Sequence, residues 1–216
     1  MFYKLTSQKM QTYGGFQWEP DAWYSSIDAI FKDSQRSLGS EAWFHCCDNP
    51  IVAIMQNPVE GQIIDPRLFR CNVKGSKRGE MGLKFGFTYM RLGEELECPK
   101  ITLNQLLAFG ILCVKEICKE KGWLEWADKW LSGVDRSKES ATAAFLAGHR
   151  GSVARHVAID AARIASCSAV IRRSCSSSDY QVTFEKRYCG SNAYLAALEA
   201  DYILPFAKLA KQAMNY

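Results

Sequence analysis

The stretch from residue 100 to residue 137 constrains the fold of this chain more than any other. Apolar residues recur there at steps of three and four, first over residues 103–118 and then over residues 123–131. That spacing places them on one face of a helix with 3.6 residues per turn. The stretch therefore predicts two successive helices that pack as a hairpin.

Local signals mark the ends of these two helices. Thr102 and Gln105 have the spacing of a capping box, in which the threonine oxygen accepts an N–H group and the glutamine reaches back to the cap. Gly122 is predicted to end the first helix in a left-handed conformation. Three tryptophans of the second helix can bury a large apolar area and seal the hairpin: Trp123, Trp126 and Trp130. The alternative is an aromatic ligand cage, but a cage needs rings from more than one helix face.

The first 98 residues alternate between apolar and polar side chains and are punctuated by glycine and proline, as in a sheet. Strands are predicted over residues 2–6, 42–47, 68–73 and 83–92. A glycine-punctuated loop over residues 75–82 is predicted between the last two strands. Short helices are predicted over residues 25–31 and from Pro50 to just before Pro58, with Asp48 or Asn49 as the cap of the second.

The chain after residue 137 is rich in alanine and predicts more helix. Helices are expected over residues 137–147, 153–173 and 191–204, with a restart at Pro205. Residues 180–188 alternate as a strand or else extend a helix. The predicted fold class is α+β: a mainly β N-terminal half with short helices (residues 1–98) and a C-terminal helical bundle (residues 99–216).

Composition excludes several classes of protein. Hydrophobic residues make up 48% and charged residues 23% of the chain, as in globular domains. No apolar run approaches the roughly 18 residues of a membrane-spanning helix, and residues 1–10 lack the apolar core of a signal peptide. We therefore expect no membrane partner and a cytoplasmic location. The net charge of +4 is compatible with nucleic acid or an acidic protein as partner without establishing either.

The nine cysteines are odd in number and include no C-x-x-C pair. A disulfide framework is typical of small secreted chains, so scattered cysteines here indicate reduced, mostly buried thiols. The alternative is a zinc site that joins His45 and either Cys46 or Cys47 to a distant cysteine, although metal ligands usually have short spacings. The prediction is no metal and no cofactor.

No catalytic motif fixes a reaction, and His45 is the best single candidate for a catalytic residue. It ends a predicted strand just before a capped helix, where an anion site could form. Cys47 is close in sequence, but a Cys–His pair needs spatial adjacency and a third, orienting group. The structural alternative is that His45 and Asp48 hold the corner between strand and helix by hydrogen bonds.

Two groups of basic residues are candidate contacts for a partner. Lys74, Lys77 and Arg78 lie in the predicted glycine loop, which is not a P-loop because G-x-x-x-x-G-K-[ST] is absent. Arg155 and Arg163 lie two turns apart on the predicted alanine-rich helix. Either group could contact phosphates or an acidic protein. A solvated surface is the alternative for both.

Two sets of motifs resemble known families. The N-terminal half resembles an uncharacterised domain of phage and bacterial proteins, through Tyr3-Lys4, Gly15-Phe16-Gln17 and the Phe-His-x-Cys-x-x-Pro element of Phe44, His45, Cys47 and Pro50. The helical half resembles the alanine-rich "immunity protein" type, through Trp123, Trp126-Ala127 and the Trp-Leu-x-Gly-x-Asp-Arg-Ser segment from Trp130 to Ser137. The alanine bias fades after Ser174, where the chain departs from that pattern.

The resemblance implies a non-enzymatic, protein-binding inhibitor from a mobile element. Such a protein would be an immunity factor or a phage counter-defence protein such as an anti-CRISPR, and its partner would be a host defence complex in the host cell cytoplasm. One alternative is an enzyme centred on His45, since the order of strand, corner and helix resembles ADP-ribosyltransferase-like folds. The other is a basic nucleic-acid-binding module. Alanine-rich helices with aromatic residues nearby would also suit a homodimer.

Overall fold

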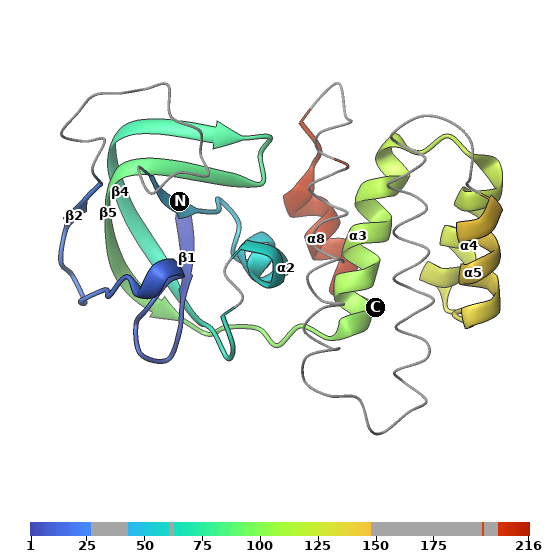
Figure 1. Ribbon diagram of the computed structural model, residues 1–216, viewed down its shortest axis with the longest axis horizontal. Helices are drawn as coiled ribbons and strands as arrows, with labels where there is room; N and C mark the ends of the chain where they lie inside the picture. Colours follow the sequence, from blue (N-terminus) through green and yellow to red (C-terminus); the bar gives the residue numbers. More distant parts are fainter. Residues whose placement is uncertain (27–42, 61–62, 148–195, 197–202) are drawn as a thin grey trace. The chain divides into compact units, whose positions relative to one another are not determined.

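The protein has an α+β fold, seen in a computed structural model that describes residues 1–26, 43–60, 63–147, 196 and 203–216 (Figure 1). The described residues divide into two compact units, Met1–Lys100 and Ile101–Tyr216, beside a boundary predicted between residues 98 and 99. A five-stranded antiparallel sheet lies in the first unit. Several predicted elements lie wholly or largely outside the described residues: the helices over 25–31, 153–173 and 191–204, and the strand over 180–188.

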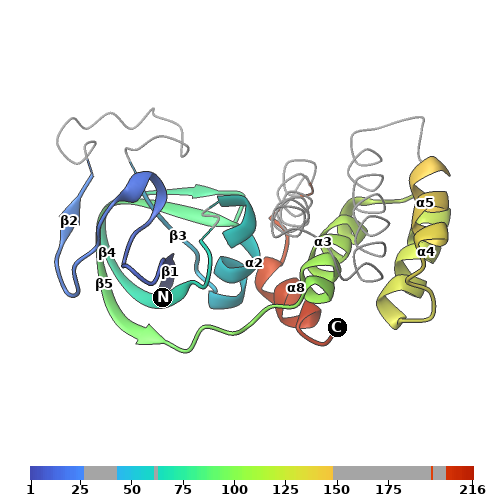
Figure 2. The same ribbon diagram turned by 60° about the horizontal axis from the view of Figure 1, so that its bottom comes forward.

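The sheet of the first unit contains the strands predicted within residues 2–6, 42–47, 68–73 and 83–92, and one additional short strand. The Gly-Phe-Gln segment at residues 15–17, expected as a strand, forms only an isolated bridge between Gln11 and Gln17. The strands are β1 (Phe2–Thr6), β2 (Tyr24–Ser25), β3 (Phe44–Cys46), β4 (Arg67–Glu80) and β5 (Lys84–Leu96). Their order is β1-β4-β5-β2, and β3 pairs with β5 as well (Figure 2). The long hairpin of β4 and β5 is the centre of the sheet, because every other strand pairs with one of its two members.

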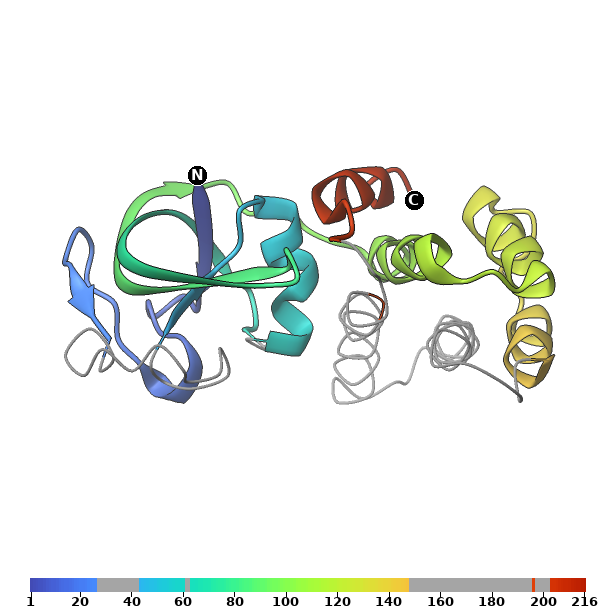
Figure 3. The ribbon, with the colours of Figure 1, turned by 90° about the horizontal axis from the view of Figure 1, so that it is seen from above.

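The strands close on themselves. The chain leaving β3 returns to β1, where the Tyr3 amide donates to the Cys47 carbonyl oxygen (2.8 Å) and the Cys47 amide donates to the Tyr3 carbonyl oxygen (2.9 Å). The circuit therefore runs β1-β4-β5-β3 and back to β1. Figure 3 shows the hairpin curling round to enclose a small barrel with β1. Closure of this kind removes most of the sheet edges that an open sheet leaves unpaired.

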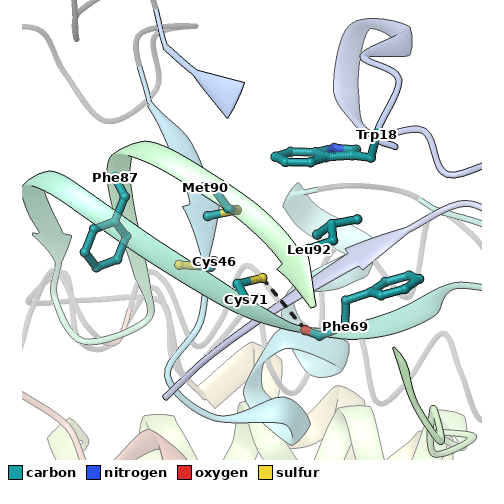
Figure 4. Packing of buried hydrophobic residues seen from close by; sticks show 7 residues of the cluster. All are labelled: Trp18, Cys46, Phe69, Cys71, Phe87, Met90 and Leu92. Atoms are coloured by element: carbon teal, nitrogen blue, oxygen red, sulfur yellow. Dashed lines mark hydrogen bonds between the residues drawn. The ribbon is translucent and has the colours of Figure 1, made fainter. Parts of the chain in front are cut away.

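The inward-facing side chains of these strands form an aromatic and sulfur-rich core. Figure 4 shows its buried members: Trp18, Cys46, Phe69, Cys71, Phe87, Met90 and Leu92. Trp18 precedes β2 and is only 1% exposed, and its Nε1 donates to the hydroxyl of Thr12 at 3.0 Å. The hydrogen bond satisfies the indole N–H, so the ring can be buried without a polar penalty. A short 3-10 helix, Tyr13–Gly15, leads the chain to this position.

The predicted loop over residues 75–82 is wrong for most of its length. β4 continues through these residues to Glu80, and only residues 81–83 turn between β4 and β5. The turn itself uses Met81 and Gly82, which have φ values of 48° and 76°. The glycines of this stretch signalled a loop, but only Gly82 lies in the turn. Gly79 pairs with Phe85 of β5, and Gly75 lies at a bulge within β4.

Helix α2 (Pro50–Glu60) follows β3 and begins as predicted. The side-chain oxygen of Asn49 accepts hydrogen bonds from the amides of Ile51 (2.9 Å) and Val52 (3.2 Å). The helix does not end before Pro58, which the sequence predicted, but runs on to Glu60. A proline removes one donor from a helix and does not forbid its last turn, where the chain is about to leave the helix anyway.

The second unit begins with the predicted pair of helices, α3 (Leu103–Ile117) and α4 (Lys121–Ser132). The capping box is present: the Gln105 amide donates to the Thr102 hydroxyl oxygen at 3.2 Å, and the Thr102 amide donates to the Gln105 side chain at 2.9 Å. The predicted cap at Gly122 is wrong, because α3 ends at Ile117 with Cys118 as its C-cap and Gly122 lies inside α4.

Two further helices are described in the second unit, α5 (Lys138–Ala147) and α8 (Phe206–Ala213). α8 packs on α3 through the rings of Phe109 and Phe206, whose centroids are 6.5 Å apart. It starts directly after Pro205, as predicted. A search of the described helices finds none with both the length and the apolarity to cross a membrane.

Candidate partner-binding surface

His45, the predicted catalytic candidate, lies in the middle of β3. Its backbone carbonyl oxygen accepts a hydrogen bond from the Nζ of Lys4 at 2.7 Å. The corner after β3 is held by the backbone of Cys47, paired with β1, and by the Asn49 cap of α2. Asp48 is exposed. Cys47 and Asn49 therefore contribute hydrogen bonds to this corner, and a catalytic role for His45 stays a hypothesis.

The described cysteines are free thiols, and all but one are buried: Cys46, Cys47, Cys71, Cys98, Cys113 and Cys118. Burial raises the pKa of the Cys46 thiol and raises that of Cys71 to about 12. A raised pKa disfavours the thiolate, which is the form that binds metals and attacks electrophiles. Within the described residues, no group of three or more His, Cys, Asp or Glu side chains is arranged to hold a metal ion.

Lys4 is the most unusual charged residue of the barrel. It stands opposite Phe69 in the pairing of β1 with β4, so its side chain enters the core. Its Nζ lies 5.3 Å from the centre of the Trp18 ring while donating to the His45 carbonyl. Part of the residue remains exposed, but its amine is enclosed, and this burial lowers the pKa of Lys4 against the opposing effect of nearby thiols, chiefly Cys71.

The three basic residues predicted to form one loop tip are distributed over two faces of β4. Lys74 stands opposite Tyr89, whereas Lys77 stands opposite the core residue Phe87. A bulge between Lys74 and Lys77 inserts extra residues and separates their faces. Arg78 follows Lys77 and alternates to the side away from the core. The other predicted contacts, Arg155 and Arg163, lie outside the described residues.

Lys74 belongs to a cluster on the outer face of the sheet, which we call the outer patch: Trp23, Lys74, Tyr89 and Arg91. The Lys74 Nζ lies 4.2 Å from the centre of the Trp23 ring and 5.5 Å from that of Tyr89. The guanidinium carbon of Arg91 lies 5.4 Å from the Trp23 ring. Trp23 is nevertheless 41% exposed. The outer patch therefore presents a solvent-accessible indole with two cations held against it, and cation–π pairing restrains their positions.

The local sequence explains why these side chains meet. Gly75 has a φ of 82°, and a Cβ atom at this position would lie 2.2 Å from the Thr88 hydroxyl oxygen and 2.7 Å from Cδ2 of Tyr89. Only glycine fits, so β4 can bulge directly after Lys74. The Ser76 amide then donates to the Thr88 hydroxyl at 3.0 Å, which fixes the bulge.

Toward the start of β4, the basic residues beyond the outer patch are neutralised across the hairpin: Arg70 pairs with Glu94 (2.8 Å), and Arg67 pairs with Glu95 (2.5 Å). Toward its end, Arg78 is a further cation on the side away from the core. Within the described residues, Lys74 and Arg91 contact rings but no carboxylate, and the buried Nε of Arg91 has no hydrogen-bond partner. Among the described residues, the two cations of the outer patch therefore have no acidic partner.

Sequence reasoning named only Lys74 of the outer patch. The alternation of β5 is a signal for Tyr89 and Arg91, which lie two residues apart and so share a face. Trp23 has no comparable signal, because it precedes a strand of two residues. For Lys4 the sequence does contain a signal: it lies two residues after Phe2 in β1, on the same face, and Phe2 packs on the core.

Comparison of this chain with models of protein families, with curated proteins and with solved structures finds no match. The family resemblances drawn from the sequence therefore stay predictions, and the function must be argued from the geometry of the site.

Proposed function

We propose that this protein is a non-enzymatic binding protein that occludes a protein partner, as an immunity factor or a phage counter-defence inhibitor does. The outer patch carries the proposal. Tryptophan, tyrosine and arginine are the residue types that most often dominate the energy of protein interfaces, and here they surround one exposed indole. The cations are already held in place by rings, so binding would cost little side-chain entropy.

An acidic protein surface suits the outer patch better than a nucleic acid. The first unit contains 12 Lys and Arg and 12 Asp and Glu residues, so its formal charge is balanced. Binding along a phosphate backbone needs a run of available cations. On β4 that run stops where Arg70 and Arg67 are neutralised by Glu94 and Glu95. A small cluster of carboxylates on a protein needs only Lys74 and Arg91.

The helical second unit also enters the proposal. We propose that it is a helical bundle, built on the described packing of α3 with α8 and of α4 with its neighbours, and that Arg155 and Arg163 add contacts from it. A homodimer in the host cell cytoplasm, with a host defence complex as target, is the wider setting that the sequence resemblance implies.

One alternative has a specific observation in its favour. Five cations lie around the hairpin at residues 74–91: Lys74, Lys77, Arg78, Lys84 and Arg91. A nucleic-acid-binding module would use several of them together, and its affinity would fall steeply as salt rises. The enzyme hypothesis depends on His45, and a His45→Ala variant that keeps every activity of the protein would remove it.

The proposal is tested by capturing partners from the native host with the wild-type protein and with three variants. Trp23→Ala and Lys74→Glu change the outer patch, and Lys9→Glu makes the same charge change at an exposed residue elsewhere in the first unit. We expect one protein to be recovered with the wild type and with Lys9→Glu, and to be reduced about tenfold or more with the two patch variants.

Three results would contradict the proposal. The partner could be recovered equally with all variants, the captured material could be removed by nuclease, or Lys9→Glu could reduce recovery as much as Lys74→Glu. The second result would favour the nucleic-acid module. The third would show that the lost recovery comes from the change in net charge and not from the outer patch.

A further inference from the structure

The half of β4 that follows Cys71 is an open edge of the described sheet. β1 pairs with β4 only from Arg67 to Cys71, although β4 continues to Glu80. Beyond Cys71, no described strand pairs with this side of β4. The residues there are exposed: Asn72, Lys74, Gly75, Ser76, Lys77 and Gly79. Backbone groups of an unpaired edge can hydrogen-bond to an added strand.

The lysines of this edge do not cover it. Edge strands commonly carry lysines that project over the backbone and block another strand from pairing. Lys74 instead lies on the rings of the outer patch, and Lys77 lies on the opposite face, with its Nζ 4.5 Å from the centre of the Phe85 ring and 5.4 Å from that of Phe2. The two ammonium groups therefore stand on either side of the edge and leave its backbone accessible.

The part of the edge that can accept a strand is short and regular. The bulge ends at Lys77, and from there to Glu80 the register with β5 is continuous. Glycine at position 79 adds no side chain at the edge, and its exposure gives an incoming backbone room to approach.

We propose that the edge of β4 from Lys77 to Glu80 binds an extended, acidic segment of a protein partner as an additional strand. Main-chain hydrogen bonds would give affinity, and carboxylates reaching Lys74 on one face and Lys77 on the other would give specificity. The proposal rests on the proposed function, because it names how the same partner is held next to the outer patch.

The test uses the full chain and a synthetic probe, a fluorescein-labelled and amidated octapeptide of sequence Glu-Glu-Val-Val-Glu-Glu-Val-Val, which places glutamates on both faces of an extended strand. Two further versions carry backbone N-methyl groups, one on the odd-numbered residues and the other on the even-numbered residues. Only one side of an added strand faces the sheet, so we expect one methylated peptide to bind about tenfold or more weakly and the other to bind within about threefold of the parent. Titration followed by fluorescence anisotropy measures all three.

Two measurements locate the bound peptide. Amide hydrogen exchange is expected to slow at residues 77–80 when the parent peptide is added. The double variant Lys74→Glu/Lys77→Glu is expected to bind about tenfold more weakly, whereas Lys9→Glu binds within about twofold of the wild type.

The proposal is overturned if both methylated peptides bind like the parent, or if the slowed amides lie elsewhere. Its failure is distinguishable from failure of the proposed function. A partner that is lost with Trp23→Ala while N-methylation has no effect leaves the outer patch as the interface and removes strand addition. A peptide that binds at residues 77–80, with a host partner indifferent to the outer patch, keeps the edge site and removes the proposed function.

Discussion

Lys4 and Lys74 each place an ammonium group near the ring of a tryptophan, in opposite surroundings. The Lys4 amine is enclosed in the barrel near Trp18, which is 1% exposed, whereas Lys74 lies at the surface on Trp23, which is 41% exposed. Inside, the amine also donates to a backbone carbonyl, because an enclosed charge needs a hydrogen bond. At the surface, water can solvate the Lys74 amine, and the pair of Lys74 and Trp23 is accessible to a partner. The same pairing therefore stabilises the core in one place and, in the proposed function, belongs to the binding surface in the other.

The largest difference between the two regions is expected for the tryptophans themselves. Trp18→Ala should lower the free energy of unfolding by about 3–5 kcal/mol, because it empties the centre of the core. Trp23→Ala should lower it by less than about 1 kcal/mol, because much of its ring is already in water. Denaturant titration of both variants measures the difference. Equal losses would show that Trp23 is a core residue and would remove the contrast.

A second variant tests how the outer patch is built. Gly75→Ala should cost about 1–3 kcal/mol, because it strains a positive φ and collides with Thr88 and Tyr89. Gly14→Ala is the matched control: it shares a positive φ, but nothing lies within 4 Å of its added Cβ, so only about 1 kcal/mol is expected. Thermal unfolding measures both. Identical losses would mean that the bulge yields to the extra methyl group.

The buried amine gives a prediction about pH. Because the pKa of Lys4 is lowered in the folded protein, the unfolded chain binds this proton more tightly. Stability should therefore rise as the pH increases from the lowered pKa toward the ordinary lysine value of about 10.4. Lys4→Met should remove that rise and add on the order of 1 kcal/mol at pH 7, since replacing a buried charge by an apolar side chain is often stabilising.

The control for this experiment is Lys74→Met, which should leave the pH dependence of unfolding as it is in the wild type. If Lys4→Met instead destabilises the protein at pH 7, then the hydrogen bond to the His45 carbonyl outweighs the cost of enclosing the amine.

The smallest expected effect is the coupling within the outer patch. A double-mutant cycle of Lys74→Met and Trp23→Ala should give an interaction energy of about 0.5–1 kcal/mol in unfolding experiments, as for exposed cation–π pairs. A coupling near zero would mean that Lys74 is not restrained by the ring, which would weaken the case that the cations are positioned in advance of binding.

The sequence predicted elements well where one local pattern decides the outcome. The periodicity of α3 and α4 and the capping box at Thr102 are local, and all are present. The cap at Gly122 failed because a glycine after a helical run fits either the end of one helix or the first turn of the next. Only the short link from Cys118 to Lys121 decides between them.

The outer patch was less predictable, because its residues meet only through the pairing register of strands that are distant in sequence. Trp23, Lys74 and Arg91 come from three separate segments, which meet only when β2 and β4 pair with β5. The predicted basic tip failed for the same reason. One bulge in β4 sends Lys74 and Lys77 to opposite faces, and a bulge depends on how Gly75 fits against Thr88, which no pattern in the local sequence reveals.

The two hydrogen bonds between Tyr3 and Cys47 also determine the order in which the first unit can assemble. β4 and β5 are neighbours in the chain and can pair as soon as both exist. β1 is synthesised first, yet its partners are residues 67–71, so it must wait until most of the unit has been made. Contacts so distant in sequence slow folding. β1 therefore pairs late although it precedes the other strands in the sequence, and until it pairs the aromatic core is exposed to other chains.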